Sequence, residues 1–172
     1  MTLTFTDNLQ LQTSLKSSLT YLSTHLVSIG IPPTSNSHSG PFTTSELLAL
    51  QERGSPINHI PPRPVLKPVL SSPETRLELT AALMESAASA QKGDLPATQS
   101  ALEKTGEAGT RAIRRYILSG KLPANAPITV HGGWMRNRVS KRPVHIPGKG
   151  FNQPLVETGE LLNSFGYKIE EK

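Results

Sequence analysis

Apolar residues recur at helical spacing in three stretches of the chain. The rows are Leu11, Leu15, Leu19, Leu22 and Leu26, then Leu77, Ala81, Met84 and Ala88, then Leu102, Gly106, Gly109, Ile113, Tyr116 and Ile117. Each spacing predicts the core-facing side of an amphipathic helix. Gly30, Gly93 and Gly120 follow the rows as expected helix ends. The paired glycines of the third row suggest that another element packs closely there, although simple tolerance of glycine in the helix explains them equally well.

Capping residues indicate where the predicted helices begin and end. Thr43 precedes Glu46 by three residues, which is the spacing of a capping box, and it predicts a short helix closed by Gly54. Ser72 followed by Pro73 predicts the start of the helix that contains the second apolar row. The helix of the third row is expected to start near Asp94 or Pro96.

Strand-like alternation is confined to short segments. Alternating apolar and polar residues predict strands at 2–6 and 166–170, and residues 127–130 suit a third strand. The stretch 131–150 is rich in glycine and basic residues and is expected to be a loop. Thr158 is expected to cap a short helix just before the last strand.

Proline dominates the region 31–73, which holds nine of the 15 prolines. Proline fixes φ and pushes the preceding residue toward extended conformations, so residues 60–70 are predicted to form a stiff, extended arm. Its apolar residues need a surface to lie on, and a neighbouring molecule suits them. Arg63 is presented on this arm, with Glu52 as its expected charge partner.

These patterns together predict an α+β fold. We expect a small antiparallel sheet packed by two to three helices, with an extended Pro-rich arm and long loops. The 172 residues suit a single domain spanning 1–172. Within it, residues 31–73 form the Pro-rich loop and arm, and residues 121–153 form a basic loop region.

Composition narrows the class of protein. The chain has no cysteine, which excludes disulfides, thiolate metal sites and a cysteine nucleophile. No apolar run approaches the roughly 18–20 residues that span a bilayer, so we expect a soluble protein with no membrane partner. Only 35% of residues are hydrophobic and eight are aromatic. Such a thin core predicts that partners or further copies of the chain supply part of the stability.

Charge is distributed unevenly. The stretch 111–149 contains nine Lys and Arg residues and no Asp or Glu, whereas the remaining 133 residues contain nine basic and 13 acidic residues. A local basic block suits phosphate or an acidic protein surface, although a solvated loop without a ligand explains it equally well. The candidate contacts to DNA or to an acidic partner are Arg114, Arg115, Arg136, Arg138, Lys141 and Arg142.

The search for catalytic chemistry finds little. His131 and His145 flank the basic loop and could meet, but no histidine pair has the spacing of a metal motif. We therefore predict no metal, no cofactor and no catalytic residue. Trp134 lies among arginines, where it could stack on a base, but a lone Trp more often anchors a loop on a core or a partner.

Three segments, in order, resemble a known family. They read LALQERG at 48–54 with IPPRPVL at 60–66, a helix with a basic end at 95–120, and QPLVETGELLNSF at 153–165 with YKI at 167–169. Together they resemble the neck or tail-completion proteins of tailed bacteriophages, over about residues 46–170. The chain departs from the family pattern at Arg53, Val65, Glu157 and Phe165, and in its longer loop 131–150.

The resemblance implies a structural virion protein rather than an enzyme. It implies a ring of identical copies, assembled in the host cytoplasm, between portal or adaptor proteins and the tail tube or tail terminator. Genomic DNA would pass through the ring and contact it transiently. The candidate assembly residues are Glu52, Ile60, Arg63, Val65, Leu66, Trp134, Leu155, Thr158, Gly159 and Leu161.

In a neck protein the basic stretch would mainly dock on acidic neighbours, because a conduit that held DNA tightly would slow its exit. Two alternatives to the neck protein remain open. A rival interpretation is a basic nucleic-acid-binding accessory protein that uses the loop 131–150. A third is a small phage enzyme that depends on His131 or His145.

Overall fold

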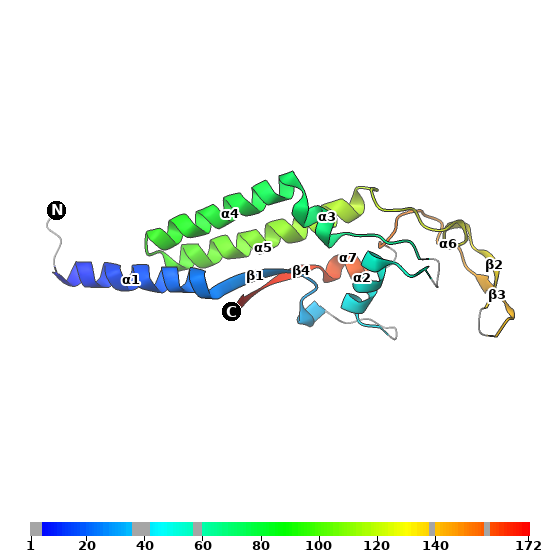
Figure 1. The fold of residues 1–172 in the computed structure, drawn as a ribbon, viewed down its shortest axis with the longest axis horizontal. Helices are drawn as coiled ribbons and strands as arrows, with labels where there is room; N and C mark the ends of the chain where they lie inside the picture. The colour runs from blue at the N-terminus through cyan, green and yellow to red at the C-terminus, as the bar shows by residue number, and fades with distance from the viewer. Residues whose placement is uncertain (1–4, 36–41, 57–59, 138–139, 157–158) are drawn as a thin grey trace.

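The chain folds into an elongated α+β molecule, with helix α1 at one end and the β2–β3 hairpin at the other (Figure 1). The computed structural model describes residues 5–35, 42–56, 60–137, 140–156 and 159–172. Within these ranges it has seven α-helices and two antiparallel two-stranded sheets, and 59% of it is helical. The predicted α+β class is confirmed.

The elements follow one another in a mixed order. The helices are α1 (Phe5–Thr24), α2 (Thr44–Arg53), α3 (Leu66–Ser71), α4 (Pro73–Gln91), α5 (Leu95–Leu118), α6 (Pro127–His131) and α7 (Glu160–Ser164), with a 3₁₀ turn at Pro33–Ser35. The strands are β1 (His25–Gly30), β2 (Gly133–Arg136), β3 (Pro143–Ile146) and β4 (Gly166–Glu171). Strand β1 pairs with β4, and β2 pairs with β3.

Helices α4 and α5 form a long antiparallel hairpin, with the starts that the sequence predicts. The Ser72 hydroxyl accepts a hydrogen bond from the Thr75 amide at 3.2 Å, and Pro73 occupies the first turn. The Asp94 carboxylate accepts from the Ala97 amide at 2.9 Å. The capping box that opens α2 is also confirmed.

Small residues fill the contact between α4 and α5. On α4 the buried residues are Thr75, Ser86 and Ala90, and the Ser86 hydroxyl donates to the Thr98 carbonyl at 3.2 Å. The second predicted row, residues 77–88, is apolar as expected but lies on the opposite side of α4 and is exposed. Its expected burial is therefore wrong, because α5 approaches closely only over the small residues.

The glycines of α5 do allow a second element to pack closely. Gly106 lies against Tyr167 of β4, and Gly109 lies against Ile29 of β1. A Cβ atom at either glycine would overlap the neighbouring side chain. The β1–β4 ribbon therefore rests directly on the α5 backbone, as the paired glycines suggest.

The N-terminal region differs from its prediction. Phe5 and Thr6 belong to α1 rather than to a strand, and residues 2–4 lie outside the described residues. Helix α1 ends at Thr24, and the segment expected to extend it to Gly30 is strand β1, which pairs with β4 instead. Leu26, the last residue of the first predicted row, therefore lies on a strand.

The hydrophobic core is small and lies around the C-terminal half of α5. It comprises Leu48, Val65, Val69, Ala112, Ile113, Ile117, Leu122 and Phe165. These residues come from α2, α3 with the residue before it, α5 with the chain just after it, and the segment that leads into β4. This core joins the Pro-rich region to the long hairpin.

Part of the predicted extended arm is helical. Residues 66–71 form α3, and Pro68 is the third residue of that helix. Proline is tolerated there because the first amides of a helix have no partner within the helix. Residues 61–64 lie outside helices and strands, whereas Val65 has a helical backbone conformation and is the N-cap of α3.

The basic region is more regular than predicted. Residues 127–131 form helix α6 rather than a strand, and the expected loop contains the β2–β3 hairpin. The Lys149 and Gly150 amides donate to the carbonyls of Thr129 and Val130 at 2.9 Å each, which ties the end of the loop to α6.

The C-terminal prediction holds for the strand. Residues 166–171 form β4, which confirms the predicted terminal strand. Thr158 lies outside the described residues, and α7 begins at Glu160 after Gly159, whose φ of 71° is in the left-handed region that favours glycine.

Candidate interaction surfaces

The segment 61–65 is held against its own chain. Arg63 is only 7% exposed, and its guanidinium donates to the Gln51 side chain and to the carbonyls of Pro123 and Ala124, each at 3.0 Å. Burial lowers the pKa of this guanidinium from its usual value. Arg63 thus links α2, the extended segment and the chain after α5.

The prediction that Glu52 forms an ion pair with Arg63 is wrong. The Glu52 carboxylate instead accepts from the amides of Val65 and Leu66, each at 2.7 Å. These amides open α3, where a carboxylate satisfies unpaired donors and complements the helix dipole. Glu52 therefore acts as a cap supplied by another helix.

Most predicted assembly residues from the Pro-rich and C-terminal motifs lie within the fold. Val65 is fully buried, while Leu66, Leu155 and Leu161 are half-buried around the core. Ile60 forms an isolated antiparallel bridge with Ser55. These residues hold the extended segment and α7 in place and present little free surface.

The β2–β3 hairpin displays two different faces. Trp134 and Arg136 lie on one face with His145, whose ring contacts Trp134 edge-on at 5.2 Å between centroids. Met135 and Val144, a cross-strand pair, lie on the other face. Trp134 is 71% exposed, so it does not anchor the loop on the chain's own core.

The basic candidates divide into bound and exposed groups. The Arg114 guanidinium donates to the Phe165 carbonyl at 2.7 Å and caps the end of α7. Arg136, Lys141 and Arg142 are exposed on the hairpin at the far end of the molecule (Figure 1), and Arg138 lies outside the described residues.

A groove runs between α4 and α5 on the exposed side of the hairpin. Its volume is about 920 Å³, and Ala82 and Ala108 contribute to its lining. The α5 border is a row at helical spacing, made of Lys104, Ala108, Arg111, Arg115 and Leu118. The groove is therefore apolar in its lining and basic along one border.

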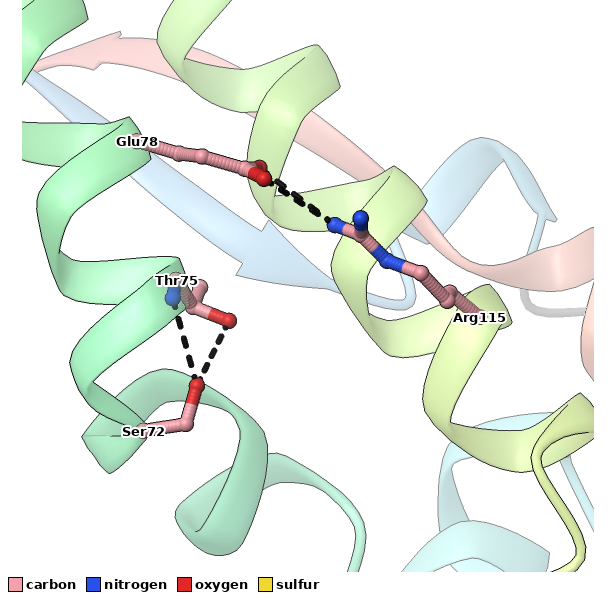
Figure 2. A network of polar contacts seen from close by, with 4 residues as sticks. All are labelled: Ser72, Thr75, Glu78 and Arg115. Carbon is pink, nitrogen blue, oxygen red and sulfur yellow. Dashed lines mark hydrogen bonds and ion pairs between the residues drawn. The ribbon is translucent and has the colours of Figure 1, made fainter.

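Ion pairs cross this groove. Arg115 of α5 reaches Glu78 of α4 at 3.3 Å, near the Ser72 cap of α4 (Figure 2). Lys104 pairs with Glu85 in the same way at 2.6 Å. All four side chains are largely exposed, and exposed pairs contribute only about 0–1 kcal/mol each. The cations therefore remain available to a further acidic group.

A ridge of apolar residues lies beside the groove. It is the row Leu77, Ala81, Met84 and Ala88, and Leu77 and Met84 are 73% and 67% exposed. Glu74, Glu78 and Glu85 follow its edge at steps of four and seven residues. The sequence reveals this row, but burial of the opposite face cannot be predicted from its small residues.

The described residues contain neither a membrane-spanning helix nor a cluster suited to a metal ion. None of the helices in the described part of the chain has both the length and the apolar character needed to cross a membrane. Within the described ranges, no three His, Asp or Glu side chains gather as a metal site would require.

Comparison with protein-family models finds no match for this chain, and comparisons with curated proteins and with solved structures find none either. The functional interpretation therefore depends on the surfaces described above and on the motifs in the sequence.

Proposed function

We propose that this chain is a structural subunit of a tailed-phage neck, which joins the head to the tail as part of a ring around the DNA channel. The observation that most strongly supports this role is the large apolar surface left uncovered on a chain with a small core. Large apolar side chains are exposed on α1, α4 and the β2–β3 hairpin. Exposed apolar side chains that gather on one face typically mark contacts with other proteins, and Leu77 and Met84 share one face of α4.

The shape of the molecule supports the same proposal. The exposed apolar elements lie at both ends and along one side of an elongated chain (Figure 1). A subunit that contacts several neighbours at once needs separate surfaces of this kind. The motifs at 48–66, 95–120 and 153–169 resemble tail-completion proteins, which gives the class of assembly.

A nucleic-acid-binding accessory protein is the second candidate, and the hairpin favours it. Trp134, His145 and Arg136 share one exposed face, and aromatic and basic side chains together can stack on bases and contact phosphates. In the neck proposal this face docks on an acidic neighbour, and Trp134 anchors it there.

One set of substitutions separates the two candidates. Arg136, Arg138, Lys141 and Arg142 are replaced together in the phage genome that encodes the chain, and the particles are examined by electron microscopy. The neck proposal predicts heads without tails and unattached tails. Normal particles made by a variant that has lost DNA binding would instead support the accessory protein.

A salt titration of the purified chain adds an independent test. Phosphate contacts weaken steeply as salt rises, because binding releases counterions. The docking role predicts no DNA shift at about 150 mM salt. Retention of DNA at that salt, with a steep salt slope, would contradict docking as the main role of the hairpin.

A further inference from the structure

We infer that copies of this chain join head to tail, with the α4 ridge of one copy seated in the α4–α5 groove of the next. The ridge is Leu77, Ala81, Met84 and Ala88, and the groove is bordered by Lys104, Ala108, Arg111, Arg115 and Leu118. This inference deepens the proposed function and rests on it for the closure of the contact into a ring.

Shape and polarity match between the two surfaces. The ridge spans 77–88, about 17 Å at 1.5 Å per residue, and the groove border spans 104–118, about 21 Å. The groove is lined mainly by apolar surface, and Leu118 at its end is 50% exposed. Leu77 and Met84 project from the ridge, and the small residues Ala82 and Ala108 leave room for them.

Charge is also complementary. Glu74, Glu78 and Glu85 follow one edge of the ridge, whereas the α5 border of the groove contributes cations. The cations on this border are Lys104, Arg111, Arg114 and Arg115, and they outnumber its one acidic residue, Glu107. Their pairs within the chain are exposed, so exchange of partners between copies costs little. An apolar strip with one acidic edge therefore fits an apolar groove with one basic border.

The arrangement of the surfaces determines the kind of assembly. The ridge and the groove are different surfaces of one chain, so each copy offers both and a contact leaves one of each unused. Such a heterologous contact continues from copy to copy, and it forms a ring where the rotation closes. A two-fold dimer, by contrast, would seat the ridge of each copy in the groove of the other at once, and no further copy could be added through these surfaces.

Complementary variants test this directly by sedimentation velocity of the full chain. The ridge variant is Leu77→Glu with Met84→Glu, and the groove variant is Arg111→Glu with Leu118→Glu; all four side chains are exposed, so folding is unaffected. Arg76→Glu with Thr80→Glu, on another exposed side of α4, is the matched control. Circular dichroism verifies the helical content of each variant.

The inference predicts that the wild type and the control form species larger than a dimer. Each variant alone stays monomeric at the same concentration, and an equimolar mixture of the two forms a one-to-one dimer, because one intact ridge still meets one intact groove. A wild type that stops at a dimer would overturn the head-to-tail contact. A ridge variant that associates as the wild type does, a groove variant that still self-associates, or a mixture that stays monomeric would overturn it as well.

The neck role and the ridge-to-groove contact can be contradicted independently of each other. If the variant with Arg136, Arg138, Lys141 and Arg142 replaced leaves particles normal, the neck role is contradicted whatever the mixing experiment gives. If that variant produces unattached tails while the ridge variant associates like the wild type, the neck role stands and only the assignment of ridge to groove is wrong.

Discussion

The Tyr167 side chain lies directly against the α-carbon of Gly106, so closely that a methyl group on the glycine would overlap the Tyr167 Cβ and Cγ atoms. This contact brings the β1–β4 ribbon onto the middle of α5. The helix therefore tolerates a residue of poor helical propensity at a position where a side chain would push the ribbon away.

Replacing Gly106 with Ala is expected to destabilise the chain. Overpacking costs about 1–3 kcal/mol, and the gain in helix propensity returns about 1 kcal/mol. Because the overlap reaches the Cβ and ring atoms of Tyr167, we predict a net loss of up to about 2 kcal/mol in the free energy of unfolding, measured by urea denaturation. Gly30→Ala is the control, because a Cβ there meets nothing within 4 Å, and its stability should not fall.

The guanidinium of Arg63 should be indispensable for the Pro-rich region. Arg63→Ala leaves three acceptors without their charged donor, and we expect a loss of about 3 kcal/mol or more in unfolding free energy. Arg63→Lys should recover little, because a single ammonium cannot reproduce the fork geometry. Arg76→Ala, on the exposed surface of α4, is expected to be neutral; equal losses for both arginines would contradict the account.

The capping box of α2 predicts a dependence on pH. Hydrogen bonds from the Thr43 amide and hydroxyl lower the pKa of Glu46 below its usual value. Its stabilising contribution is therefore present above the ordinary carboxyl pKa and is lost as the pH falls through the lowered one. The stability difference between the wild type and Glu46→Ala should be present at pH 7 and vanish in acid. A difference that persists in strong acid would exclude the carboxylate as its source.

Trp134 reports on assembly, because it is the single tryptophan of the chain and is 71% exposed. The free chain should show the long-wavelength emission of a hydrated indole and full quenching by acrylamide. Incorporation into particles should shift the emission to shorter wavelength, because an anchoring Trp loses its water. Unchanged emission in assembled particles would show that the hairpin does not dock through this residue.

Local chemistry in the sequence predicts several elements well. The capping box at Thr43, the Ser72–Pro73 start and the Asp94 cap each depend on groups within one helical turn, so their prediction needs no tertiary information. For the close approach at Gly106, the paired glycines of α5 allow two interpretations from the sequence, close packing and simple tolerance, and the contact with Tyr167 confirms close packing.

Other features depend on contacts that the sequence does not reveal. The leucine spacing continues through Leu26, but pairing with β4 makes that segment a strand. The second apolar row includes Leu77 and Met84, so the pattern predicts their burial, whereas the helix packs through Ser86 and Ala90. Prediction of the groove likewise requires knowledge of how α4 and α5 are placed relative to each other. The spacing of its border row on α5 is nevertheless visible in the sequence.

Electron microscopy of the purified full chain tests the central claim most directly. The account predicts closed rings with one rotational symmetry and a central opening, built from copies joined by a single repeated contact. Chains that remain single at high concentration, or that grow into open filaments without closing, would contradict it.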